Sequence, residues 1–170
     1  MKTLLKRAGW ILLAFLFVGT GLGVGVIAFW QATHQAKDTT SVVNIPTQKL
    51  KGTQLSGFTP VAKVDSLQKD DTKLGDGAEA KTGSTVTVQY TGAVAATGVI
   101  FESSIDAGRP VTFGLDQVIK GWTEGVPGMK VNGQRRLLIP ASLAYGANSP
   151  SPDIPANADL VFDITLLDVK

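Results

Sequence analysis

The segment 117–146, QVIKGWTEGVPGMKVNGQRRLLIPASLAYG, carries aromatic side chains toward both ends of one short unit. It begins with the apolar pair Val118 and Ile119 and runs into a short helical segment that contains Trp122. It ends in a turn that holds Tyr145. Little that could act as a nucleophile or a general base lies between the two rings. The segment therefore predicts an apolar binding site.

The middle of this segment predicts a helix near 119–126 followed by a strand. Pro127 ends the helix, because the residue before a proline is pushed out of the α region. Residues 135–139, RRLLI, lie between Gly133 and Pro140, which is typical of a strand bounded by turn residues.

Outward from this unit, short strands are predicted on both sides. Residues 85–91 alternate strictly, so Val86, Val88 and Tyr90 share one face of a half-buried strand. Shorter apolar stretches precede the turn at 75–77, and further strand signals follow at 99–104, 111–113 and 160–166, with a Pro-rich loop over 146–158. Strands joined by Gly and Pro turns around one brief helix indicate an α+β domain with a mainly antiparallel sheet.

Charge is distributed unevenly along the 170 residues. Residues 1–63 carry seven Lys and Arg against one Asp, whereas residues 64–170 carry nine against thirteen Asp and Glu. A mildly acidic domain is a poor match for phosphates, so a nucleic-acid partner is not expected. The chain has no cysteine, which excludes disulfides, thiolate chemistry and cysteine-bound zinc.

The N-terminus predicts a membrane anchor. Residues 8–30 carry no charge, follow three positive residues, and have Trp10 and Trp30 near their ends. About 20 apolar residues span a bilayer core, and positive flanks remain cytoplasmic. A cleaved signal peptide has the same charge order, but its apolar region is normally shorter and no A-x-A-like site follows. The pattern favours a single-pass protein of the cell membrane, with a cytoplasmic N-terminus and an extracytoplasmic domain.

Residues 31–63 predict a flexible linker, because they are polar and lack a sustained apolar period. The only histidine, His34, lies in this linker, far from any partner in the sequence. Ser-His-Asp catalysis and histidine metal sites are therefore disfavoured, and no G-x-x-x-x-G-K-[ST] loop is present. The folded domain is expected over residues 64–170.

The chain from about Val64 to Lys170 resembles FKBP-type peptidyl-prolyl cis/trans isomerases, in a membrane-anchored, bacterial-like form. The matching segments keep their order and spacing over essentially the whole domain. They are VQYTG (88–92), FESS (101–104), VIKGWTEGVPGM (118–129), AYG (144–146), IP (154–155) and LVFDITLLDV (160–169).

The resemblance implies an antiparallel sheet curled around one short α-helix, with an apolar site between them. The implied catalytic residues are Tyr90, Phe101, Glu102, Trp122, Tyr145 and Phe162. The implied substrate-binding residues are Val111, Val118, Ile119 and Ile154, with the Ile119 amide and the Tyr145 phenol donating to substrate carbonyls. No cofactor and no metal are expected. The implied partners are X–Pro segments of folding proteins and macrolide inhibitors of the FKBP class.

Two positions depart from the family's usual pattern. Glu102 stands where an aspartate is usual, and Val111 stands where a larger apolar ring is common. Some members carry an arginine partner for the acid where this chain has Ala107, which leaves Arg109 as the candidate substitute. These changes bear on turnover and inhibitor affinity.

The expected activity is therefore rotation of X–Pro amides, with a folding or chaperone role outside the membrane. Two other hypotheses stay open: a non-catalytic module that holds proline-containing segments, and a structural anchor whose function lies in residues 8–30. Each aromatic residue also has an ordinary interpretation as core. Their conjunction in family order favours a site.

Overall fold

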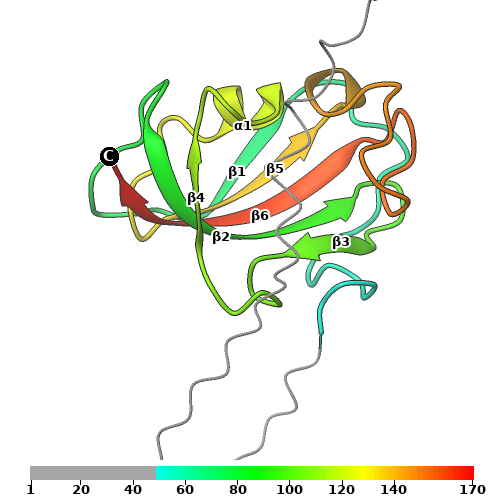
Figure 1. Ribbon diagram of the computed structural model, residues 1–170, viewed down its shortest axis with the longest axis horizontal. Coiled ribbons are helices and arrows are strands. Elements are labelled where there is room, and N and C mark those ends of the chain that lie inside the picture. The colour runs from blue at the N-terminus through cyan, green and yellow to red at the C-terminus, as the bar shows by residue number, and fades with distance from the viewer. Residues whose placement is uncertain (1–48) are drawn as a thin grey trace, which may run out of the picture. The chain divides into compact units, whose positions relative to one another are not determined.

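The computed structural model describes residues 49–170, which form one compact unit built on a six-stranded antiparallel sheet. The strands follow the order β1-β5-β6-β2-β3, and β4 pairs with the half of β2 that β3 leaves free (Figure 1). Their bounds are β1 Gln68–Lys73, β2 Thr85–Val94, β3 Ile100–Ser103, β4 Val111–Gly114, β5 Gln134–Ile139 and β6 Leu160–Val169.

The two central strands follow the predicted alternation. Val86, Val88 and Tyr90 of β2 are buried, as are Leu160, Phe162, Ile164 and Leu166 of β6. Strands β2 and β6 pair over almost their full length, from Val86 with Val169 to Val94 with Leu160. The half-buried strand pattern is confirmed, and it places the aromatic side chains of both strands on one face.

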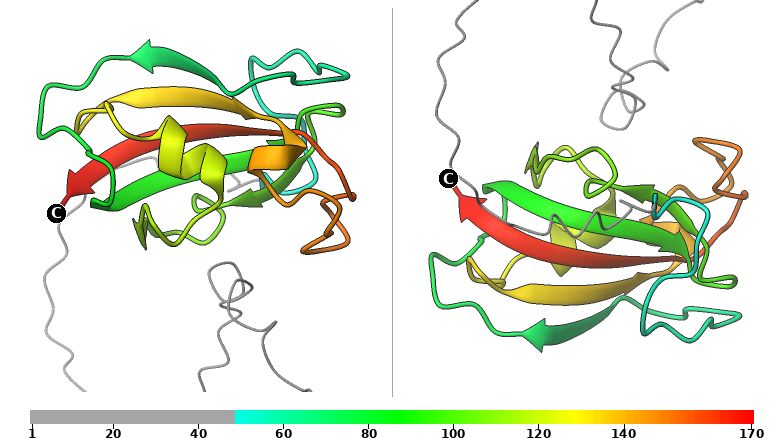
Figure 2. Two further views of the ribbon diagram at one scale, coloured as in Figure 1. Left: turned by 90° about the horizontal axis from the view of Figure 1, so that it is seen from above. Right: turned by 90° about the horizontal axis from the view of Figure 1, so that it is seen from below.

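A single α-helix, α1 (Lys120–Gly125), lies over one face of the curved sheet, and the other face carries no helix among residues 49–170 (Figure 2). Glycines let α1 approach β5 closely. A Cβ at Gly121 would lie 2.4 Å from Ile139 Cγ2, and one at Gly125 would lie 2.7 Å from Leu137 Cδ1. Both distances are shorter than any ordinary contact, so the short helix can pack this closely only where it lacks side chains.

Strand β1 differs from the sequence expectation of two short segments around residues 64–67 and 72–74. It runs from Gln68 to Lys73 as QKDDTK, and all six residues are exposed. No apolar alternation marks it, because β1 is an edge strand held by pairing with β5. Charged side chains are typical of edges, where they discourage pairing with other chains.

Residues 49–63 also differ from the expected flexible linker, because in the structure they pack on the domain. Leu55 is buried against Ala93, Ile100 and Val161. The Leu55 amide donates to the Gly98 carbonyl at 2.9 Å, and the Val61 amide donates to the Ala95 carbonyl at 2.9 Å. One buried leucine and a series of backbone hydrogen bonds hold the segment without an apolar period.

Within residues 49–170, no helix is long and apolar enough to cross a membrane. The expected anchor at 8–30 and the first part of the expected linker lie outside the described residues.

Candidate active site

Trp122 lies at the centre of a cluster of aromatic rings between α1 and the sheet. Its ring meets three others edge to face: Tyr90 at 5.5 Å, Phe162 at 5.4 Å and Phe113 at 5.7 Å between centroids. The interplanar angles lie between 83° and 90°. This geometry sets the positive edge of one ring against the negative face of another, which favours a fixed arrangement.

Phe101 extends the cluster from β3. Its ring lies 5.8 Å from that of Phe162 at an angle of 84°. Both rings lie against the backbone of Gly92, where a Cβ would be 2.7 Å from Phe101 Cζ and 2.7 Å from Phe162 Cε1. Gly92, the last residue of the VQYTG motif, therefore makes room for two of the predicted site residues.

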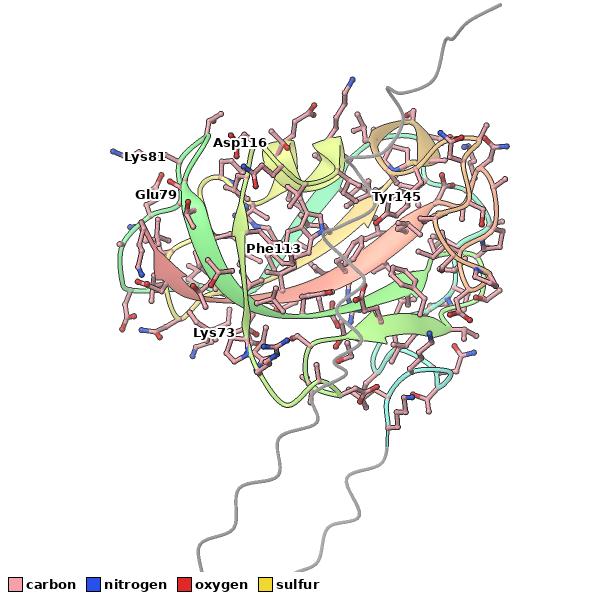
Figure 3. All side chains as sticks on the ribbon, viewed as in Figure 1. Lys73, Glu79, Lys81, Phe113, Asp116 and Tyr145 are labelled. Carbon is pink, nitrogen blue, oxygen red and sulfur yellow. The ribbon has the colours of Figure 1, made fainter. Side chains whose placement is uncertain are left out.

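Phe113 is a member of this cluster that the sequence analysis did not select. It comes from β4, is 8 % exposed, and lies 6.1 Å from the Tyr90 ring. The alternation of Val111, Thr112 and Phe113 was the available signal, since it puts Phe113 on the same face as the selected Val111. Figure 3 shows Phe113 on the same side of β6 as α1.

Val118 and Ile119 directly precede α1, the helix that carries Trp122, and both are partly exposed. The Ile119 carbonyl accepts the amides of Trp122 at 2.9 Å and Thr123 at 3.2 Å, and the Thr123 hydroxyl donates to the Leu115 carbonyl at 2.7 Å. The Ile119 N–H forms no hydrogen bond within residues 49–170, as is usual at a helix start.

Tyr145 follows the 3₁₀ helix η2 (Ala141–Leu143) and is partly exposed. The Gly146 amide donates to the Ala141 carbonyl at 2.9 Å, and the Asn157 amide donates to the Gly146 carbonyl at 2.7 Å. These bonds fix the turn that presents the phenol (Figure 3). Ile154, from the Pro-rich loop that these bonds close, is 5 % exposed.

Glu102 lies half-buried on β3, opposite Gly92 of β2. Burial raises the pKa of this carboxyl, while a hydrogen bond from the Tyr90 phenol and the charge of Lys51 oppose the rise. Burial and the Glu102 charge raise the pKa of Tyr145 to about 12, and with the Glu102 hydrogen bond they raise that of Tyr90 further. Both phenols therefore remain protonated donors at neutral pH.

The cation that acts on Glu102 corrects the expectation from the sequence. Arg109 is exposed and forms no ion pair within residues 49–170. Lys51 supplies the positive charge instead. No sequence signal pointed to Lys51, because it precedes Glu102 by about half the domain and lies in the expected linker.

The structure thus brings five predicted residues around one ring cluster and its acid: Tyr90, Phe101, Trp122 and Phe162, with Glu102 bonded to Tyr90. Tyr145 lies near enough for its pKa to respond to the Glu102 charge. Val111, Val118 and Ile119 are partly exposed, and Ile154 is buried. Among residues 49–170, no group of three His, Cys, Asp or Glu side chains could hold a metal ion.

A separate groove of about 340 Å³ has residues 50 and 54–56 and the side chains of Gln89, Thr91 and Asp163 in its lining. These three belong to the alternate set of sheet positions, which point away from α1. Tyr90 is the one member of the ring cluster in that lining. The groove is distinct from the aromatic site, and we assign it no role.

Comparison with known proteins agrees with this geometry. A family model described as FKBP-type peptidyl-prolyl cis-trans isomerase matches residues 77–167. FK506-binding protein 4 of Aspergillus fumigatus is 42% identical over 127 residues, which are 74% of this chain and 25% of that protein. Peptidyl-prolyl cis-trans isomerase FPR2 of Saccharomyces cerevisiae is 49% identical over 94 residues, 54% of this chain and 70% of that protein.

Among solved structures, FkpA from Escherichia coli superposes with a TM-score of 0.57 at 40% identity. The match covers 68% of this chain and 53% of that one. The chain spans about a quarter of the length of the FK506-binding protein 4 relatives. With its matching family model, its antiparallel sheet and its short helix, the chain belongs to the FKBP-type peptidyl-prolyl cis-trans isomerase family.

Proposed function

We propose that this protein is a peptidyl-prolyl cis/trans isomerase whose site is the ring cluster around Trp122. The observation that carries the proposal is the edge-to-face packing of Trp122 with Tyr90 and Phe162, beside two hydrogen-bond donors. These donors are the Tyr145 phenol and the Ile119 amide. In this proposal a prolyl ring packs against the margin of this buried cluster, and the polar groups serve the carbonyls that flank it.

The reaction needs no nucleophile. Resonance gives the X–Pro amide partial double-bond character, and its rotation is opposed by a barrier of roughly 18–20 kcal/mol. Twisting the bond removes that resonance and makes the amide less dipolar, so a dry apolar site favours the twisted amide over the planar one. Preferential binding of the twisted amide lowers the barrier.

Each residue then has a definite task. Trp122 and Phe162 hold the prolyl ring. Tyr90 and Phe113 fix the position of Trp122, and Phe101 fixes that of Phe162, through edge-to-face contacts. The partly exposed side chains of Val111, Val118 and Ile119 contact the residues beside the proline, and the buried Ile154 supports the Pro-rich loop next to them. The Tyr145 O–H and the Ile119 N–H donate to substrate carbonyls and keep the flanking chain still while the amide turns.

Glu102 has an indirect task. It accepts a hydrogen bond from Tyr90 and thereby orients a ring that contacts Trp122. Its longer side chain, compared with the usual aspartate of the family, still reaches Tyr90 in this structure. Glu102 is therefore a positioning residue in this proposal.

The cellular setting of the activity is part of the proposal. The charge order and length of residues 1–30 support a retained single-pass anchor, with the domain outside the cytoplasm. Clients would be X–Pro segments of proteins that fold there, because uncatalysed X–Pro isomerisation takes tens to hundreds of seconds. Relatives named for FK506 binding support macrolides of that class as inhibitors.

A binding module without turnover is the second candidate, and Glu102 and Val111 are what favour it. A protease-free isomerisation assay separates the enzyme from the binding module. It uses the full chain in a mild detergent and a substrate peptide of the type Ala-Leu-Pro-Phe. We expect catalysis in the wild type and a large loss in Tyr145→Phe and Trp122→Ala, with Leu74→Ala as a control on an exposed leucine.

Circular dichroism and thermal unfolding of each variant show whether the fold survives. Tyr145→Phe is the sharper variant, since it removes one partly exposed hydroxyl and no packing. A folded wild type that leaves the isomerisation rate at background would reject the enzyme in favour of the binding module.

A further inference from the structure

The segment 50–55 lies before residues 77–167, which the family model matches, and it pairs with the chain that leads into β3. The Gly52 amide donates to the Ile100 carbonyl at 2.8 Å, and the Ile100 amide donates to the Thr53 carbonyl at 2.9 Å. Gln54 forms an antiparallel bridge with Val99. The segment therefore lies at the edge of the strand that carries Phe101 and Glu102.

Asp106 fixes the start of this segment. Its two carboxylate oxygens accept the backbone amides of Leu50 and Lys51, each at 2.8 Å. Asp106 belongs to the loop between β3 and β4, a few residues beyond Glu102. A bidentate carboxylate on two successive amides sets the backbone of Lys51 and hence the direction in which its side chain leaves.

The Lys51 side chain reaches the Pro-rich loop. Its Nζ lies 2.6 Å from Asp153 Oδ2, and the next residue, Ile154, is buried. Ile154 is itself held by bonds of the loop, because its amide donates to the Ser151 carbonyl at 3.1 Å and its carbonyl accepts the Ser149 hydroxyl at 2.7 Å. One lysine thus joins the edge of β3 to the loop that supplies a predicted substrate-binding residue.

We propose that Lys51 is a positioning residue of the isomerase site, which holds the Pro-rich loop to the β3 edge and places a positive charge near Glu102. The inference rests on the proposed function and extends it to a residue outside residues 77–167, the range that the family model matches. Both partners of the ion pair are about half exposed, at 43% and 48% of their side chains. Exposed ion pairs contribute little to global stability, so Lys51→Met should leave the free energy of unfolding nearly unchanged. Its effects should be local, at the Pro-rich loop and at Glu102.

The charges around Glu102 determine the sign of the electrostatic effect. Tyr90 donates to Glu102, Tyr145 is a neutral phenol close by, and Lys51 is the cation. Asp106 and Asp153 are occupied by the Lys51 backbone and side chain. Burial raises the pKa of Glu102 and Lys51 opposes that rise, so loss of Lys51 makes Glu102 take up a proton at a higher pH.

The test uses the full chain in a mild detergent, labelled with ¹³C at glutamate carboxyl groups. Glu79, Glu102 and Glu124 are the three glutamates of the sequence, and Glu102→Gln identifies the signal of interest. We expect Lys51→Met to raise the pKa of Glu102. Lys51→Arg keeps the positive charge, so the pKa of Glu102 should stay at the wild-type value. Lys49→Met is the matched control, because it removes the same charge two residues away and should leave the Glu102 titration unchanged.

Asp153→Asn separates the two tasks of Lys51. It breaks the tie to the Pro-rich loop and keeps the ammonium, so Glu102 should not titrate at a higher pH. Hydrogen exchange at the Ile154 amide should accelerate in both Asp153→Asn and Lys51→Met. In isomerisation assays, the acid side of the kcat/KM profile should move to higher pH in Lys51→Met alone.

An unchanged Glu102 titration together with unchanged Ile154 exchange in Lys51→Met would overturn the proposal. Changes of equal size in Lys49→Met would also overturn it, because they would reflect net charge and not position. The titration and exchange measurements need no turnover. An inactive wild type with these shifts would reject the proposed isomerase function and retain Lys51 as a positioning residue of a binding site.

Discussion

The Arg135 guanidinium of β5 holds Asp71 of β1 through two hydrogen bonds, from Nε to Oδ1 at 2.6 Å and from Nη2 to Oδ2 at 2.9 Å. Its remaining nitrogen, Nη1, donates to the carbonyls of Gly125 at 2.7 Å and Pro127 at 3.2 Å. Arg135 is 7 % exposed. One buried cation therefore joins the edge strand to the end of α1, the helix that positions Trp122.

Loss of the Asp71–Arg135 pair should make the free energy of unfolding less dependent on pH in the acid range. The Arg135 hydrogen bond lowers the pKa of Asp71 below its ordinary value of 3.8. Because the pKa of Asp71 is lower in the folded state than in the unfolded state, its charged form stabilises the fold at pH values above the unfolded-state pKa. This stabilisation is lost as the pH falls through the folded-state pKa. The unfolding free energies of the wild type and Asp71→Asn, measured in urea, should therefore begin to converge below about pH 4 and meet only below the lowered pKa of folded Asp71.

At neutral pH we expect Asp71→Asn to lower the free energy of unfolding by about 1–2 kcal/mol, discounted because the Asp71 side chain is 37% exposed. Asp70→Asn is the matched control on the same exposed strand, since Asp70 pairs in register with Arg136 and not Arg135. An equal loss of stability in both variants at every pH would contradict a specific role for the Arg135 pair.

Gly92→Ala should disturb the aromatic cluster, because the added methyl on β2 points at two of its rings. The new methyl would lie 2.7 Å from both Phe101 Cζ and Phe162 Cε1, so the rings or the strand must shift. Overpacking of this kind costs about 1–3 kcal/mol. Thermal unfolding and near-ultraviolet circular dichroism should both change, and Phe101→Leu in the same chain should recover part of the stability. Wild-type values in Gly92→Ala would show that the rings tolerate the added carbon.

Phe113→Leu tests the ring that sequence reasoning missed. Leucine keeps most of the apolar volume but loses the edge-to-face contact with Trp122 at 5.7 Å and the tilted contact with Tyr90 at 6.1 Å. We expect a stability loss of about 1–2 kcal/mol and a reduced kcat/KM, because Trp122 would no longer be held on that side. Phe58→Leu is the control, since Phe58 packs on the small core around Leu55, away from the ring cluster.

If Phe58→Leu and Phe113→Leu reduce kcat/KM equally, the effect of Phe113 belongs to general stability. A reduction confined to Phe113→Leu places that ring in the site.

Leu55→Ala tests whether residues 49–63 are part of the folded unit. Leu55 is 6 % exposed and packs against Ala93, Ile100 and Val161. Truncation of a buried leucine costs about 2–5 kcal/mol, and a site near the surface belongs at the low end of that range. Leu74→Ala, at an 81% exposed leucine, should have almost no effect. Equal urea midpoints for the two variants would mean that the segment is not held in solution.

Much of the architecture could be predicted from local patterns in the sequence. Alternation defined β2 and the first part of β6, and Pro127 marked the end of the helix to within about two residues. Family motifs in the right order selected Tyr90, Trp122 and Phe162, which the structure brings into mutual contact. These features depend on near neighbours in the chain, so the sequence carries them directly.

The tertiary structure alone decided which distant segments support the site. Lys51 acts on Glu102 and pairs with Asp153, and Arg135 joins β1 to the end of α1, across separations that no periodic pattern encodes. Residues 49–63 and strand β1 lack an apolar period because backbone hydrogen bonds to the sheet edge, and not a continuous buried face, hold them. The sequence by itself selected four rings of the cluster, and only the folded chain added Phe113 and the charged residues that hold the surroundings of the cluster in place.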